Sequence, residues 1–412
     1  MAQLGKIRKV IYPLMGNHFN IIVIGKGLVG SAAARCLSLK DSNIAIIGPD
    51  EPADYNESIV FASHYDQARV QRIMGKDETW TKLNLDSAAQ YETIQKQSGI
   101  NFHEPVGCLY VNPYGRDQYL ANIPVLAAKF NQPIKEFHSA AEINDVFKDF
   151  NFPAGSEGVF EQSPSGYINP RLLVKAQLRI FKQQNGIVLN ETITDVLFTN
   201  NSFTVTSQEG NTYTASKVLV AAGSFVNYMQ LIPERIQLKS KSEVVLLAKV
   251  SKEEAGKYAE LPSLLYEINN SDVEGIYMIQ PVSYPDGEYY LKIGCNMPED
   301  IYFETLEQVQ YWFREGDSSR FAPKLLNELK KILPGLTVNE YLTKKCITSY
   351  TAHRRPYIGQ SNTKGLYIAG GCNGYSAMCS DAIGSVAAHL IQTGTIPEGF
   401  PDHAFELKYQ ER

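Results

Sequence analysis

The sequence predicts an α/β protein in which a parallel-sheet domain is interleaved with a second, α+β domain built on a mixed or antiparallel sheet. Three observations support this. An apolar run at 20–24 ends in a glycine-rich turn, and two later apolar runs end at Gly223 and Gly371. From 236 to 345, short segments instead alternate polar and apolar side chains, as half-buried strands do. A chain of 412 residues is also too long for one core.

The glycine-rich turn belongs to a strand–turn–helix signature. The run at 20–24 is rich in β-branched residues, and an alanine-rich helical pattern follows at 28–40. Gly25 permits a tight turn, Gly27 lets the backbone approach a phosphate, and Gly30 lets the helix pack on the strand. The residues expected to contact a pyrophosphate are Gly25, Gly27, Leu28, Val29 and Gly30. The motif predicts a Rossmann-like dinucleotide site without separating FAD, NAD and NADP.

The segment 44–47 reads as the second parallel strand of a βαβ unit. An acidic residue at the end of this strand usually binds the ribose hydroxyls. Gly48 stands at that position here, and Pro49, Asp50 and Glu51 follow it. We expect Asp50 or Glu51, with Glu51 favoured, to reach back to the ribose, unless the ribose is held in another way.

The remaining elements follow from periodicity and from turn residues. Helical spacing predicts helices over 79–99, 170–184, 303–315, 322–333 and 376–393. Strand patterns occupy 108–111, 187–190, 194–198, 202–207, 212–222, 243–250, 276–281, 288–294 and 365–371. Pro170 suits the first position of a helix, and the Pro-Asp-Gly run at 285–287 predicts a turn between strands.

The nucleotide-binding domain is predicted to be discontinuous. Its expected pieces are 19–100, 151–235 and 341–395, whereas 101–150 and 236–340 form a substrate domain and 1–18 and 396–412 are terminal extensions. Small residues at the strand ends Ala222-Gly223 and Gly370-Gly371 leave room for a ligand. Since an ordinary NAD dehydrogenase has no use for the distant third piece, this plan indicates FAD.

Composition excludes several classes of partner. The net charge of −5 favours neither nucleic acid nor an anionic membrane surface, and no apolar run is long enough to span a bilayer. The basic segment 6–13 lacks the apolar core of a signal peptide. Six scattered cysteines without a Cys-x-x-Cys pair argue against a metal site and a disulfide framework. We expect a cytoplasmic monomer or homodimer.

Five segments in this order resemble the D-amino-acid oxidase superfamily of FAD-dependent oxidoreductases, in its sarcosine oxidase and glycine oxidase branch. They are 21–35, 63–72, 215–225, 290–294 and 346–381, within a resemblance that covers 20–393. Beyond the glycine turn, the resemblance implies FAD contacts at Ser63, His64, Arg69, Ala222, Gly223, Cys346, Gly371, Asn373, Gly374, Tyr375 and Ser376.

Two residues carry the flavin chemistry that this resemblance implies. Lys292 interrupts an apolar strand segment, where it could simply face solvent. The matching lysine of sarcosine oxidases lies over the flavin, where a fixed cation stabilises superoxide as it forms from O₂. Cys346 matches a cysteine that those enzymes join covalently to the flavin 8α carbon, although a small buried residue is the alternative. Ala352 and His353 replace the proline and aspartate of that segment.

The substrate half of the site departs from the sarcosine oxidase pattern. Arg72, three residues after Arg69, matches an arginine that can hold a substrate carboxylate through two charge-assisted bonds. Two surface arginines on a helix are the alternative. Met378 replaces a second carboxylate-binding lysine, Asn296 replaces a histidine, and Thr348 replaces a tyrosine. The resemblance therefore does not indicate sarcosine itself as the substrate.

The resemblance implies an FAD-dependent oxidase of an amine or amino acid, with a secondary or N-alkylated substrate favoured. A hydride would pass to flavin N5, the imine would hydrolyse, and O₂ would be reduced to H₂O₂. Lys292 and Arg72 are the expected catalytic residues, and solvent or His353 would take the amine proton. Two alternatives stay open: a flavin dehydrogenase of a hydroxy acid or amine with another electron acceptor, and a non-catalytic FAD-binding maturation or partner protein.

Overall fold

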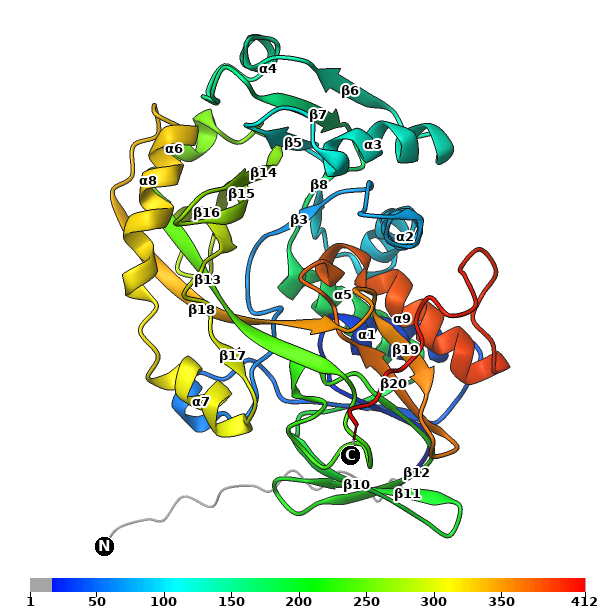
Figure 1. Ribbon diagram of the computed structural model, residues 1–412. Helices are drawn as coiled ribbons and strands as arrows, with labels where there is room; N and C mark the ends of the chain where they lie inside the picture. Colours follow the sequence, from blue (N-terminus) through cyan, green and yellow to red (C-terminus); the bar gives the residue numbers. More distant parts are fainter. Residues whose placement is uncertain (1–16, 412) are drawn as a thin grey trace, which may run out of the picture.

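The computed structural model describes residues 17–411. The first of its sheets has eight strands, some of them parallel (Figure 1). The strands along its path are β10 (Ile193–Thr199), β11 (Ser202–Ser207), β12 (Thr212–Val220), β1 (His18–Ile24), β2 (Ile44–Ile47) and β9 (Ile187–Leu189), with β20 (Leu366–Gly370) beside β12 and β19 (Tyr357–Gln360) beside β20. Strands β20, β12, β1, β2 and β9 run parallel to one another, with β9 at the edge of the sheet. The predicted α/β fold, with three distant strand ends at one sheet, is confirmed.

Four helices pack around this sheet and each other. They are α1 (Leu28–Leu37), α2 (Glu78–Ser98), α5 (Pro170–Gln183) and α9 (Ser376–Thr393). Asn169 caps α5 by accepting the Leu172 N–H, and Pro170 is its first residue. The alanine-rich face of α1 lies close to α9, because a Cβ on Gly384 would lie 2.6 Å from the Ala32 Cβ. The predicted bounds of α9 are correct, and α1 ends three residues earlier than predicted.

The second sheet has nine strands and is antiparallel except between β14 and β5. Its strands are β17 (Tyr302–Phe303), β13 (Leu238–Val250), β16 (Tyr289–Asn296), β15 (Glu274–Ser283), β14 (Ser263–Asn269), β5 (Cys108–Asn112), β7 (Glu157–Glu161) and β6 (Ile134–Phe137), with β18 (Glu340–Thr351) beside β13. Strands β7 and β18 fall in ranges predicted for the nucleotide-binding domain. In the structure, however, both belong to this second sheet, where β7 pairs with β5 and β18 pairs with β13. Their pairing departs from the predicted division, which remains a prediction elsewhere.

Shorter elements complete the described chain. A three-stranded sheet contains β3 (Arg69–Gln71), β8 (Gly166–Ile168) and β4 (His103–Glu104). The other helices are α3 (Gln118–Lys129), α4 (Ala140–Val146), α6 (Lys252–Lys257), α7 (Leu306–Arg314) and α8 (Ala322–Ile332), with the 3₁₀ turns η1 (Tyr55–Glu57), η2 (Gly223–Phe225) and η3 (Ser319–Phe321). Helices α6 and α8 lie along one side of the second sheet in Figure 1. Within residues 17–411, no helix combines the length and apolar character of a membrane span.

The predicted C-terminal extension is packed against the first sheet. Phe405 is buried, and its carbonyl accepts the Ile358 N–H at 2.9 Å. The Gln237 N–H donates to the Lys408 carbonyl at 2.7 Å, so the segment also reaches the start of β13. The predicted N-terminal extension, 1–18, lies outside the described residues apart from its last two, and His18 already belongs to β1.

Candidate functional site

Two cavities adjoin between the strand ends of the first sheet and the second sheet. The smaller has a volume of about 230 Å³ and is lined by the glycine turn and the ends of β2, β12 and β20. The larger has a volume of about 1670 Å³ and is lined by strands of the second sheet together with residues of the segments 51–76 and 373–378. The residues that both cavities share in their walls are Phe61, Ala62, Ser63, Tyr65, Arg69, Ser224, Cys346, Ile347, Thr348, Gly374 and Ala377.

The glycine turn is shaped by close backbone contacts. Gly25 has φ +103°, and a Cβ there would lie 2.4 Å from the Ala221 carbonyl oxygen. A Cβ on Gly30 would lie 1.8 Å from the Gly25 oxygen, whereas one on Gly27 would meet only His64 Nδ1, at 3.8 Å. No side chain caps the start of α1. Its first N–H groups therefore remain available to an anion in the smaller cavity, so this wall fits a dinucleotide pyrophosphate.

The end of β2 is built around Lys26 instead of an acidic residue. A Cβ on Gly48 would lie 2.6 Å from the backbone nitrogen of Lys26, so a larger residue does not fit there. Lys26 Nζ binds both Asp50 and Asn190. Glu51 accepts Arg171 Nε at 2.7 Å and lines the larger cavity. The structure thus brings neither Asp50 nor Glu51 to the wall of the smaller cavity, contrary to the expected ribose contact.

Most of the other residues expected to contact FAD meet at the smaller cavity. Those in its wall are Gly25, Gly27, Leu28, Val29, Ser63, His64, Arg69, Ala222, Gly223, Cys346, Gly374 and Ser376. Asn373 and Tyr375 line the larger cavity instead. Gly30 and Gly371 line neither and serve packing, because a Cβ on Gly371 would lie 2.3 Å from Thr351 Cγ2. Burial, reinforced by Arg171 and other cations, lowers the pKa of His64 to about 3.

Lys292 lies in a buried charge cluster directly behind the larger cavity. Its side chain is 1% exposed, and Nζ donates to Asp66 Oδ2 at 2.6 Å and to the Ala68 carbonyl at 2.9 Å. Asp66 also pairs with Arg69 and accepts the Tyr284 hydroxyl at 2.9 Å. Burial and Arg69 lower the pKa of Lys292, whereas the Asp66 carboxylate favours its charged form. Asp66 and Arg69, not Lys292, line the cavity, and the solvent-facing alternative for Lys292 is wrong.

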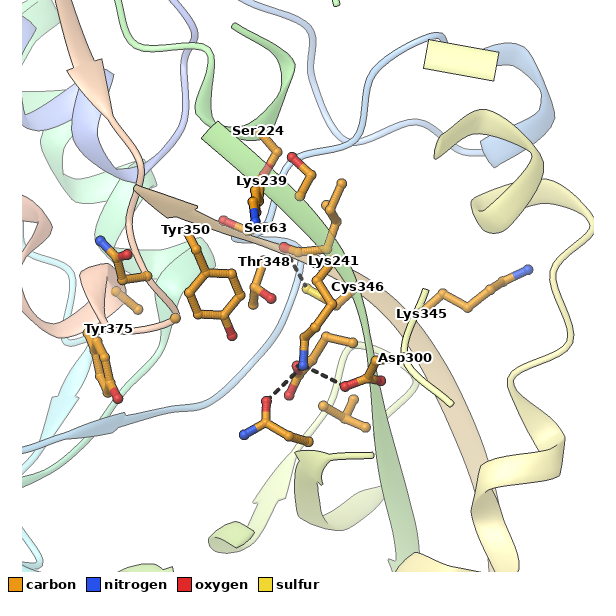
Figure 2. A pocket seen from close by; sticks show the side chains of 18 of the residues that line it. Ser63, Ser224, Lys239, Lys241, Asp300, Lys345, Cys346, Thr348, Tyr350 and Tyr375 are labelled. Carbon is orange, nitrogen blue, oxygen red and sulfur yellow. Dashed lines mark hydrogen bonds and ion pairs between the residues drawn. The ribbon is translucent and has the colours of Figure 1, made fainter. Parts of the chain in front are cut away.

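Cys346 lies on β18 in the wall shared by both cavities. Its cross-strand partner on β13 is Glu243, and Lys241 stands opposite Thr348. Figure 2 shows Lys241 reaching towards Asp300, with Nζ 2.5 Å from Asp300 Oδ2. Lys241 also binds Asn296 Oδ1 at 2.7 Å. Burial raises the pKa of Glu243 to about 7. Sequence reasoning missed this cluster, although charged residues inside an apolar strand were its signal.

Arg72 is a buried cation that faces the larger cavity. Its guanidinium carbon lies 5.1 Å from the centre of the Tyr375 ring and 5.7 Å from that of Tyr119, whose hydroxyl it also binds. The residue is 3% exposed, and the described part of the chain offers it no ion pair. The alternative of surface arginines on a helix is wrong, since Arg69 is in β3 and Arg72 follows it. A buried cation without a counter-ion among the described residues fits an anionic ligand.

The structure does not bring His353 to the site. Its Nε2 contacts the Glu406 carbonyl at 3.0 Å, and its Nδ1 accepts the Arg355 N–H at 3.2 Å. His353 lines neither cavity, so the geometry does not support its expected role as acceptor of the amine proton. Met378, by contrast, is buried in the wall of the larger cavity.

Comparison with known proteins agrees with this geometry. The family model for FAD-dependent oxidoreductases (DAO) matches residues 20–390. N-methyl-L-tryptophan oxidase from Yersinia pestis (strain Pestoides F) is 28% identical over 217 residues, 52% of this chain and 56% of that protein. The match thus spans about half of that relative's length.

Solved structures share the fold over nearly the whole chain. NikD, an unusual amino acid oxidase essential for nikkomycin biosynthesis, has a TM-score of 0.76 and 16% identity, covering 96% of this chain and 98% of NikD. Glycine oxidase from Geobacillus kaustophilus has a TM-score of 0.73 and 14% identity, covering 96% and 100% of the two chains. At such identities the likeness shows the fold alone.

Proposed function

Since the chain belongs to the family of FAD-dependent oxidoreductases, we propose that it is an FAD-dependent oxidase of an amino acid or amine whose nitrogen is secondary or N-alkylated. The observation that supports the substrate assignment is the buried Arg72 in the wall of the larger cavity, which has no ion pair within residues 17–411. FAD, when bound, supplies a hydride acceptor at N5 that O₂ reoxidises with formation of H₂O₂. A cytoplasmic location and a monomeric or homodimeric state belong to the same proposal.

The protein's own residues divide into a binding half and an electrostatic half. The N–H groups at the start of α1 hold the dinucleotide phosphates. Arg72 binds and orients the substrate carboxylate, and the aromatic rings around it limit water access. Lys292, through its position behind Asp66 and Arg69, supplies positive potential at the cavity wall. The imine product hydrolyses in water without a protein nucleophile.

Anaerobic mixing of the flavin-loaded protein with candidate substrates tests this function. The panel contains N-methyl amino acids, cyclic imino acids and simple amines, and the reading is the loss of the visible flavin band. We expect bleaching by at least one secondary amino acid, followed by one H₂O₂ per turnover when O₂ is admitted. Bleaching without peroxide would favour the dehydrogenase with another acceptor. A protein that binds FAD but is bleached by no member would favour the non-catalytic partner.

Covalent attachment of the flavin at Cys346 is a separate proposal. The thiol lies in the wall that both cavities share, where it can meet a ring that extends from one into the other. We expect the yellow chromophore to stay with acid-precipitated wild-type protein and to be released from Cys346→Ser. Cys295→Ser, which alters a buried cysteine outside both cavity walls, is the control and should retain it. Release from the wild type contradicts the linkage but not the oxidase.

A further inference from the structure

The larger cavity contains a carboxylate that none of the roles above uses. Glu267 lies on β14, is half-buried and lines the cavity together with Arg72. The described residues give its side chain neither a hydrogen bond nor an ion pair. Burial raises the pKa of Glu267, and Arg72 and Lys76 oppose this shift. A carboxylate in this setting lacks a counter-ion of its own.

Arg72 and Glu267 are close but do not satisfy each other. Arg72 directly follows β3, and β3 contacts β14, which carries Glu267. The two side chains form no ion pair, although both line the larger cavity and Arg72 is the first of the two cations that oppose the rise in the pKa of Glu267. The other charged groups around Glu267 are Lys76, Asp117 and Glu274. Arg72, which can bind an anion, and Glu267, which can bind a cation, thus line the same cavity without forming an ion pair with each other.

We propose that Glu267 is the counter-ion for a protonated amine of the ligand whose carboxylate Arg72 binds. The pair would select molecules that carry both charges over simple carboxylates and over amines without a carboxylate. This inference rests on the proposed function of the cavity and adds a second recognition element to it. The cation is either the amine next to the carboxylate or a more distant side-chain amine.

Three probes separate these cases in the flavin-loaded protein, with Kd read from the perturbed flavin spectrum under anaerobic conditions in which the flavin is not bleached. Trimethylglycine carries a cation beside its carboxylate, and 3,3-dimethylbutanoate has the same shape without the cation. The third probe, 5-aminopentanoate, carries a distant cation. In Glu267→Gln we expect the Kd of trimethylglycine to rise about tenfold and that of 3,3-dimethylbutanoate to stay within about twofold.

The controls distinguish a lost charge from a disturbed fold. Glu274→Gln removes another carboxylate from the same cavity wall, at the exposed start of β15, and should leave all three Kd values unchanged. Glu267→Asp keeps the charge and should retain the preference for trimethylglycine. A selective loss of 5-aminopentanoate would support the counter-ion and assign it to a side-chain amine.

Two results would overturn the inference in different ways. If Glu267→Gln weakens no cationic probe, or weakens all three probes equally, Glu267 is not the counter-ion, while Arg72 and the oxidase proposal stand. If the wild-type protein binds none of the three carboxylates, the assignment of Arg72 fails and the inference built on it falls as well.

Discussion

Arg72→Met is expected to lower kcat/KM for amino acid substrates by about 100-fold, because two charge-assisted hydrogen bonds to the carboxylate are lost. An amine that lacks a carboxylate should lose less than about threefold, since it never made those bonds. The measurement is the steady-state kcat/KM of the variant and of the wild type for an amino acid substrate and for an amine that lacks a carboxylate. Because Arg72 loses a hydrogen bond to the Tyr119 hydroxyl but no ion pair within the described chain, the variant should melt only a few degrees below the wild type.

Arg320→Met is the matched control for Arg72→Met. Arg320 also lies over an aromatic ring, with its guanidinium carbon 4.8 Å from the centre of Phe321, but it lines neither cavity. Its removal should leave kcat/KM unchanged for both substrates. A loss of activity in Arg72→Met that is equally large for amines with and without a carboxylate would contradict carboxylate binding by Arg72.

Lys292→Met is expected to slow reoxidation of the reduced flavin by O₂ by about 100-fold, with flavin reduction changed by less than about tenfold. The physical reason is the loss of a positive charge directly behind the cavity wall formed by Asp66 and Arg69, where it would stabilise negative charge that develops in the cavity. Stopped-flow mixing of the reduced protein with O₂ measures this step separately. Asp66 keeps Arg69 and the Tyr284 hydroxyl as partners, so the variant does not leave its carboxylate alone.

Lys249→Met provides the comparison for Lys292→Met. Lys249 lies on the neighbouring strand β13 and pairs with Glu288 at 3.1 Å, away from both cavities. Reoxidation of this variant should match that of the wild type. If Lys292→Met also reoxidised at the wild-type rate, the Lys292 cation would have no part in the reaction with O₂.

The parts of the fold that follow from neighbouring residues were predictable. The strand, turn and helix around Gly25 depend on backbone freedom and on a local apolar pattern, and both are legible in the sequence. Helix α9 was predicted at its correct bounds because its small residues follow directly from a glycine-rich strand end. Arg72 and Lys292 could be assigned to the site only through the family resemblance, because most arginine and lysine residues of a protein lie on its surface.

The parts that depend on distant contacts were not predictable. Glu51 stands at a plausible ribose position, but Arg171, 120 residues away, binds it. His353 lies in the segment 346–381 that resembles the oxidase family. Its ring nitrogens, however, contact the Glu406 carbonyl and the Arg355 N–H instead of facing a cavity. Glu267 has no sequence signal, because an alternating strand admits a glutamate on either face. Only the packing of β14 against β3 shows that the face of β14 that carries Glu267 lines the larger cavity.

The pairing of β1 with β12 and of β12 with β20 sets an order for biosynthesis. Ile24 lies opposite Val220, and Val220 lies opposite Ile368, so the sheet joins the two ends of the chain. Such long-range parallel pairing is slow, and a growing chain cannot complete it before its last strand has left the ribosome. The second sheet can assemble its β15–β16 hairpin earlier. The wall of the smaller cavity, which contains residues at the ends of these strands, is therefore completed only after β20 has left the ribosome.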